Sequence, residues 1–219
     1  MSQATSATDY ECEVTVHAGN RRLEGILSVP AQARGVVLFA HGSGSGRHSP
    51  RNQFVARVLQ QAGLTTLLID LLEEDEGADR RRVFDIELLA RRLLSATEWL
   101  SNHPDTSALR FGYFGASTGA GAALVAAAQQ PDKVAAIVSR GGRADLAGAG
   151  LRHVQAPSLL IAGGNDDIVL ELNERAFERL RCPKKLVVIP GATHLFEEPG
   201  ALEEVSRLAQ AWFVQHLTA

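Results

Sequence analysis

Several features that mark particular classes of protein are scarce or missing in this sequence. Its 219 residues include only two cysteines, Cys12 and Cys182. Two are too few for a disulfide framework or a cysteine-rich metal motif, so we expect reduced thiols, with a pairing between them left open. The formal net charge is −3, so there is no basic footprint of the kind that binds nucleic acid. Apolar runs such as Val36–Ala40 are far shorter than a membrane span requires.

The composition instead fits one ordinary globular domain. Hydrophobic residues make up 45% and charged residues 21%, and a chain of this length can bury a core without disulfides or metals. Residues 1–12 show neither a basic start nor an apolar stretch, which predicts a short flexible tail on a cytoplasmic protein. Residues 13–219 are expected to form a single domain. Whether that domain forms a homo-oligomer is left open.

Short β-rich runs alternate with stretches of helical period. Two runs around the turn Ala18–Arg21 predict an antiparallel hairpin, and the later runs are almost continuously apolar, as in strands buried on both faces of a parallel sheet. The predicted strands are 14–17, 23–29, 36–40, 65–70, 110–114, 134–139, 158–162 and 186–189. The predicted helices are 52–61, 84–100, 118–129, 170–180 and 202–217. This pattern predicts an α/β fold with a mostly parallel twisted sheet, an N-terminal hairpin and helices on both faces.

The carboxyl ends of strands in such sheets are where ligands bind, and one of these ends carries a candidate nucleophile. The run 110–114 is followed by Gly115–Gly119, a G-x-S-x-G sequence between a predicted strand and a predicted helix. In a nucleophile elbow the glycines let strand and helix approach closely, and the sharp turn exposes the serine hydroxyl. An ordinary glycine-rich turn is the alternative. The strand–turn–helix context favours Ser117 as a nucleophile.

A serine hydroxyl needs a base that removes its proton. For this type of elbow the chain order is serine, acid, histidine. Asp166 and Asp167 follow one later strand, and His194 follows the last strand. We therefore predict His194 as the base and one of the two aspartates as its partner. The other aspartate would be solvated or would cap the next helix.

The glycine-rich segment His41–Gly46 follows the predicted strand 36–40. A phosphate-binding P-loop requires a lysine after the glycines, and none is present; the glycine spacing also fails the dinucleotide fingerprint. The better interpretation is an oxyanion loop. In it, the backbone N–H groups of Ser43 and Thr118 would hold the negative charge that develops on a substrate oxygen. No cofactor and no metal ion is expected.

Together these segments resemble the α/β-hydrolase fold and, within it, the dienelactone-hydrolase-like group. The resemblance is carried by His41–Gly44, the elbow at Ser117, the G-x-D-x-x-V segment Gly164–Val169, and Gly191–His194. It runs from about residue 14 to the C-terminus and implies that Asp166 is the catalytic acid. Dienelactone hydrolases proper use a cysteine nucleophile, so the serine at position 117 points instead toward a serine esterase, thioesterase or related acyl hydrolase.

Arginines crowd the predicted loops around the site. Arg47 and Arg140 are candidates for binding an acidic ester or lactone, because a guanidinium fork holds carboxylate or phosphate well. The alternative is that this chain uses arginine in place of lysine throughout, since its lysines are only Lys133, Lys184 and Lys185. The sequence leaves both interpretations open.

Two connections bear on access to the site. The connection 140–157 is too short for the multi-helix cap of many α/β-hydrolases, which predicts an open site. The charged segment 73–82 is either a solvated loop and helix start or a mobile flap. We expect an enzyme that hydrolyses a small-molecule ester, thioester or lactone, with neither nucleic acid nor membrane as a partner. A non-hydrolytic ligand-binding protein and an acyltransferase on the same scaffold are the alternatives.

Overall fold

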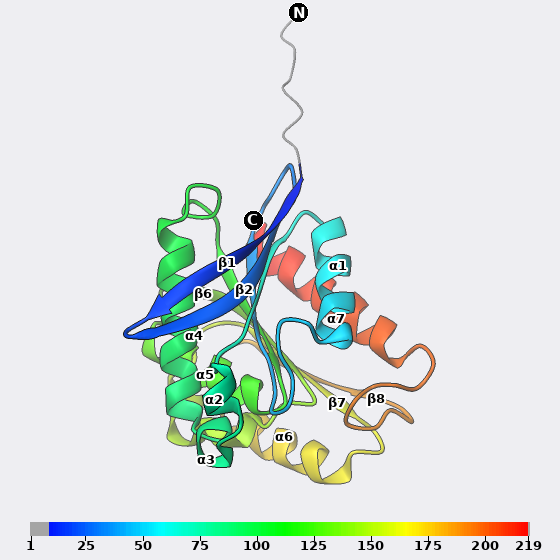
Figure 1. The fold of residues 1–219 in the computed structure, drawn as a ribbon. Helices are drawn as coiled ribbons and strands as arrows, with labels where there is room; N and C mark the ends of the chain where they lie inside the picture. Colours follow the sequence, from blue (N-terminus) through cyan, green and yellow to red (C-terminus); the bar gives the residue numbers. More distant parts are fainter. Residues whose placement is uncertain (1–8, 219) are drawn as a thin grey trace, which may run out of the picture.

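The computed structural model describes residues 9–218 and is built on an eight-stranded sheet with the strand order β1-β2-β4-β3-β5-β6-β7-β8 (Figure 1). The strands are β1 (Tyr10–Ala18), β2 (Arg21–Val29), β3 (Val36–Ala40), β4 (Thr65–Ile69), β5 (Phe111–Ala116), β6 (Val134–Arg140), β7 (Ser158–Gly163) and β8 (Lys184–Ile189). The pairs β1–β2 and β2–β4 are antiparallel, and every pairing from β4 across to β8 is parallel. The predicted sheet with its N-terminal hairpin is confirmed.

Helices cover both faces of this sheet. The main helices are α1 (Pro50–Gln61), α4 (Ile86–Asn102), α5 (Thr118–Gln129), α6 (Asp167–Arg179) and α7 (Ala201–Leu217). Figure 1 shows α1 and α7 together on one face and α4 and α5 on the other. Each layer buries its own apolar cluster against the sheet. Every residue of the central strands β3, β4 and β5 is therefore buried, which explains their nearly continuous apolar sequences.

Three features differ from the expected elements or add to them. Strand β1 begins at Tyr10, so residues 10–12, expected in the tail, belong to the sheet; residues 1–8 of that tail lie outside the described residues. The first residues of β1 are exposed on an edge strand, so no apolar pattern marked them. Two short helices, α2 (Glu74–Gly77) and α3 (Arg80–Val83), occupy the charged segment. The connection between β6 and β7 holds one 3-10 segment, η1 (Ala144–His153).

Two further expectations concern cysteines and membranes. Cys12 is exposed on β1, Cys182 is buried before β8, and both are free thiols. Burial raises the pKa of the Cys182 thiol, so this side chain behaves as a small apolar group of the core. Within residues 9–218, no helix is both long enough and apolar enough to cross a membrane.

The acidic run after β4 is held in place by arginines. Glu76 is only 1% exposed, and its carboxylate accepts two hydrogen bonds from Arg92 on α4, one of them 2.6 Å long. Arg82 adds a contact of 2.8 Å to the same carboxylate. Hydrogen bonding from Arg92 is the largest of the effects that lower the pKa of Glu76 to about 2. The buried end of α2 is thus fixed to α4 by a paired charge.

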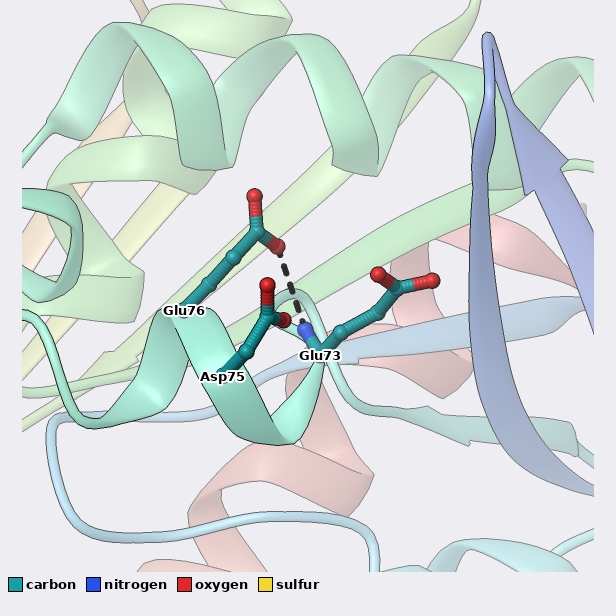
Figure 2. A group of neighbouring side chains, drawn as sticks. All are labelled: Glu73, Asp75 and Glu76. Atoms are coloured by element: carbon teal, nitrogen blue, oxygen red, sulfur yellow. Dashed lines mark hydrogen bonds between the residues drawn. The ribbon is translucent and has the colours of Figure 1, made fainter.

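Glu73, Asp75 and Glu76 form a tight carboxylate cluster, with ligand oxygens within 4.8 Å of one another (Figure 2). Figure 2 shows Glu73 pointing away from Glu76 toward the β1–β2 hairpin, where Arg21 contacts both Glu73 and Asp75. Arginine side chains therefore already balance the charge of all three carboxylates. The cluster works as an ion-pair clamp between α2, the hairpin and α4. This clamp anchors the segment that the sequence left open as a solvated loop or a flap.

Replacing Glu76 by Gln removes the counter-charge of the buried Arg92. We expect the free energy of unfolding near pH 7 to fall by about 3 kcal/mol, since one half of a buried ion pair is left uncompensated. The folded pKa of about 2 lies below the ordinary value of 4.5. The ion pair therefore stabilises the fold fully above pH 4.5, and this stabilisation is lost as the pH falls toward 2. Urea unfolding at neutral and acidic pH measures both effects.

Glu171→Gln is the matched control, because it breaks an exposed ion pair with Arg175 on α6. We expect it to change the stability by less than about 0.5 kcal/mol. Similar losses in the Glu76 and Glu171 variants would contradict the assignment of the clamp.

Candidate active site

The carboxyl ends of the parallel strands meet at one edge of the sheet. The segments at this edge bring together Gly42 after β3, Ser117 after β5, Gly141 after β6, Asp166 after β7 and His194 after β8. All three residues predicted as nucleophile, acid and base thus belong to one edge, although Ser117 and His194 are 77 positions apart in the sequence (194 − 117).

Ser117 occupies a sharp turn between β5 and α5. Its backbone has φ 50° and ψ −124°, a conformation that side chains rarely adopt. Glycines on both sides make the turn possible. A Cβ on Gly119 would lie 2.0 Å from the carbonyl oxygen of Ala40, and one on Gly115 would lie 2.4 Å from Cα of Ala120. The close packing of β3, β5 and α5 therefore holds the strained serine in place.

His194 and Asp166 form a hydrogen-bonded pair, with Nδ1 of the ring 2.7 Å from Oδ2 of the carboxylate. An ionised carboxylate can only accept, so Nδ1 carries the hydrogen and Nε2 of the neutral ring is free to accept a proton. Two backbone hydrogen bonds of 2.9 Å tie the turn after β7 to the loop after β8. The neighbouring Asp167 is exposed and begins α6. The pair is thus positioned by the backbone of both loops.

The segment after β6 lies between Ser117 and His194. The Ser117 N–H donates to the Arg140 carbonyl at 3.3 Å, and the Arg143 N–H donates to the Ser117 carbonyl at 2.9 Å. A Cβ on Gly141, whose φ is 51°, would lie 3.5 Å from Nδ1 of His194. Among the described residues no hydrogen bond joins the Ser117 hydroxyl to the His194 ring. Bonds between a nucleophile and its base often tighten only once a substrate is bound.

The loop after β3 approaches Ser117 closely, since a Cβ on Gly42 would lie 2.8 Å from Cβ of Ser117. His41 orients the peptide between Gly42 and Ser43, because its Nδ1 lies 2.9 Å from the Gly42 carbonyl oxygen. Its Nε2 accepts a hydrogen bond of 3.0 Å from the Leu71 backbone N–H. The peptide is trans, so the N–H of Ser43 points away from that carbonyl. Thr118 begins α5, and its N–H is one of the donors that a helix leaves without an intrahelical acceptor.

A cavity of about 480 Å³ opens beside this loop. It reaches Thr118, whereas Ser117 and His194 are not part of its lining. Its walls include the apolar side chains Leu72, Val83 and Leu89 and the charged side chains Arg22, Glu24, Arg47, Asp70, Glu73 and Glu74. Asp70 is paired with Arg47 and Glu73 with Arg21, which leaves Glu24 and Glu74 against Arg22 and gives the lining a small net negative charge. The size suits part of a small molecule.

The two arginines predicted to bind substrate have different surroundings. The Arg47 N–H donates to the Asp70 carboxylate at 2.6 Å, and its guanidinium pairs with the same carboxylate. Its charge is therefore balanced within the protein. Arg140 is buried, and the described residues include no carboxylate at ion-pair distance from it. Substrate binding by either arginine stays a prediction.

Several residues that shape the site gave no usable signal in the sequence. Phe196 is fully buried two residues after His194 and has φ 57°, which is rare for a bulky side chain. Nothing in its sequence neighbourhood indicates this conformation. Asp70 directly follows β4, although the predicted strand included it, and this place at a strand end was the signal that could have identified it. His41 was noted only as part of the glycine-rich loop.

The sequence model of the dienelactone hydrolase family matches residues 23–216, which is most of the chain. The chain belongs to the dienelactone hydrolase family. A solved dienelactone hydrolase from Anabaena variabilis is 58% identical, covers 95% of this chain and 99% of its own, and superposes with a TM-score of 0.93. The predicted α/β-hydrolase fold is therefore confirmed, and this family member shares it over nearly its whole length.

Other relatives differ in length or are more distant. A Mycobacterium tuberculosis H37Rv protein named as a phosphoribosyl transferase is 60% identical over 205 residues, which is 94% of this chain and 46% of the relative. The chain thus spans about half the length of this relative. Est1E from Butyrivibrio proteoclasticus shares the fold at 16% identity, with a TM-score of 0.80 over 93% of this chain and 98% of its own.

A methyl group at residue 119 tests the close contact behind the elbow. In Gly119→Ala the added carbon would lie 2.0 Å from the Ala40 carbonyl oxygen, so the backbone must move. We expect a loss of about 3 kcal/mol in the free energy of unfolding. In the control Gly150→Ala the nearest atom lies 3.8 Å away, and the change should be below about 0.5 kcal/mol. Urea unfolding compares the two, and equal stabilities would contradict the packing argument.

Proposed function

We propose that this family member hydrolyses small carboxylic esters, thioesters or lactones through an acyl-enzyme, with Ser117 as nucleophile, His194 as base and Asp166 as acid. The observation that carries the proposal is the His194–Asp166 hydrogen bond of 2.7 Å at the sheet edge that also holds a serine in a strained turn. Membership of a hydrolase family supports bond cleavage by water. The hydroxyl nucleophile supports two-step acyl transfer.

In the first step Ser117 Oγ attacks the substrate carbonyl carbon while Nε2 of His194 accepts the hydroxyl proton. Asp166 keeps the ring in the required tautomer and stabilises the imidazolium that forms. The tetrahedral intermediate then expels the alcohol or thiol, which takes the proton from His194; in a lactone this leaving group stays tethered. Water repeats the attack on the acyl-serine, with His194 again as base. The acid is released and the Ser117 hydroxyl is restored.

Backbone donors would stabilise the negative oxygen of each tetrahedral intermediate. We assign this role to the N–H groups of Ser43 and Thr118. The close approach of Gly42 to Ser117 and the position of Thr118 at the start of α5 support the assignment. The positive end of the α5 dipole adds to the field at this point. His41 acts through the Gly42–Ser43 peptide that it orients, so it is a positioning residue.

The cavity next to the oxyanion loop would receive one side of the substrate. Leu72, Val83 and Leu89 give it an apolar part, and its remaining lining is net negative. A neutral or cationic group fits there better than a carboxylate, because like charges would be brought together in a partly enclosed space. An acidic group of a substrate would have to lie on the other side of Ser117.

Transfer to an acceptor other than water is the second candidate. The name of the Mycobacterium tuberculosis relative favours a transferase, but that name belongs to a chain about twice as long as the part matched here. Product analysis with a competing alcohol separates transfer from hydrolysis. Steady turnover of a simple ester separates both from a ligand-binding protein, which would bind or become acylated without cycling.

Asp166→Asn should lower kcat/KM for para-nitrophenyl acetate roughly 10⁴-fold, because the amide favours the wrong tautomer of His194. Ser117→Ala and His194→Ala should reduce it at least as far. Asp167→Asn is the matched control and should stay within about twofold of the wild type, since Asp167 is exposed at the start of α6. Full turnover by Ser117→Ala would overturn the mechanism. A severe loss in Asp167→Asn with a mild one in Asp166→Asn would reassign the acid.

A further inference from the structure

Arg140, the last residue of β6, is a buried cation without a counter-charge. Its side chain is only 7% exposed, and both Nε and Nη1 are buried without a hydrogen-bond partner among the described residues. Within residues 9–218, the one hydrogen bond of this side chain is donated by Nη2 to Asn52 Oδ1 at 3.5 Å, the outer limit for such a bond. Buried charges in proteins are normally paired, because leaving one unpaired costs several kcal/mol. Within the described residues, this guanidinium therefore lacks the counter-charge that a buried cation normally has.

The groups around Arg140 are positive or neutral. Asn52 lies in the first turn of α1, so the guanidinium is placed against a helix N-terminus, whose dipole also favours an anion. Arg51 precedes Asn52, and its Nε is also buried without a partner. The Phe196 ring centroid lies 5.9 Å from the Arg140 guanidinium carbon and covers one side of it. Burial, together with the charge of Arg51, lowers the pKa of Arg140 to about 10.

The backbone of this helix end also has hydrogen-bonding capacity left. Pro50, the first residue of α1, has no N–H, and the Asn52 N–H reaches the Ser49 hydroxyl only at 3.5 Å. The Arg51 N–H has no acceptor within residues 9–218. The exposed Glu197 pairs with the outer end of Arg51, with Nη1 and Oε1 2.9 Å apart. Within residues 9–218, Glu197 is thus the one carboxylate at ion-pair distance from Arg51, and none lies at that distance from Arg140.

We propose that Arg140, Arg51 and the first turn of α1 form a binding site for a small oxyanion, either a carboxylate or a phosphate. Nε and Nη1 of Arg140 and Nε of Arg51 have almost no accessible surface, so the side chains that cover them must shift when the anion binds. The oxyanion would then accept hydrogen bonds from these three atoms and from the Arg51 backbone amide. Arg140 also joins this site to the catalytic edge, because its carbonyl accepts the Ser117 N–H and the next residue, Gly141, lies beside the His194 ring.

Two sources could supply the oxyanion. It could be a charged group of the substrate itself, an interpretation that rests on the proposed function and agrees with the negative lining of the cavity on the other side. It could also be a free anion that binds beside the site and stabilises the segment holding Ser117 and His194. The chemistry of recognition is the same in both cases, so the experiment needs one arm for each source.

The binding arm uses inorganic phosphate, with chloride at equal ionic strength as the reference, and does not depend on any activity. We expect phosphate to raise the melting temperature of the wild type and of Arg175→Met, an exposed arginine on α6. Arg140→Met should abolish this rise and Arg51→Ala should weaken it. Methionine is chosen because replacing a buried unpaired charge with an apolar chain is often tolerated. Arg140→Lys provides a second variant that retains the charge and should retain part of the rise.

The kinetic arm compares para-nitrophenyl hemisuccinate with para-nitrophenyl acetate. If the substrate supplies the anion, Arg140→Met should lower the ratio of the two kcat/KM values about tenfold or more, and phosphate should inhibit hemisuccinate hydrolysis competitively. If the anion is free, the ratio stays constant and only the phosphate-dependent stabilisation is lost. A phosphate-dependent rise in melting temperature that survives in Arg140→Met would overturn the site. The site would also be overturned if phosphate did not stabilise the wild type and Arg140→Met left the ratio of the two kcat/KM values unchanged. A protein without esterase activity that still binds phosphate through Arg140 would overturn the proposed function alone.

Discussion

The contact between the first turn of α5 and the end of β3 determines where Ser117 lies. Residue 119 has no side chain, so the helix backbone can approach the Ala40 carbonyl to a distance that a Cβ would forbid. The same approach brings Gly42 against Ser117 and forces the serine into a backbone conformation that it would not adopt alone. Ser117, the loop after β3 and the N-terminus of α5 are thus one packing unit. Asp166 and His194 lie on the loops after β7 and β8, which extend from the same edge of the sheet.

Two buried arginines, Arg92 and Arg140, differ in whether a carboxylate balances their charge. On the α4 side, Arg92 is matched by Glu76, and this pair holds α2 over the cavity. On the α1 side, Arg140 is buried to a comparable depth, but no carboxylate among residues 9–218 pairs with it. The fold thus provides a buried counter-charge for Arg92 and none, among the described residues, for Arg140. We therefore treat the first as structural and the second as a place for a ligand, although both lie close to the same strand ends.

The fold could be predicted, and so could the sheet edge that carries Ser117, because their signals are local. Continuous apolar runs marked the buried strands, and the G-x-S-x-G sequence marked Ser117 because the elbow depends on near neighbours in the chain. Chain order and the positions at strand ends indicated His194 and the two aspartates Asp166 and Asp167, and the choice of Asp166 rested on the family resemblance. The ion-pair clamp at Glu76 and the pairing of Arg47 with Asp70 could not be predicted, since both join segments that are distant in sequence. The depth of Arg140 was equally hidden, because arginines are common along this chain and burial depends on packing.

The most direct test of the account is whether the Ser117 hydroxyl is activated, measured as intact mass after treatment with an alkyl fluorophosphonate. The account predicts a single adduct on the wild-type protein, located at Ser117 by peptide mapping and absent from Ser117→Ala. It also predicts that Asp166→Asn, folded to the same extent, reacts far more slowly. An unmodified wild-type protein, or an adduct that persists in Ser117→Ala, would contradict the claim that this sheet edge holds a working serine nucleophile.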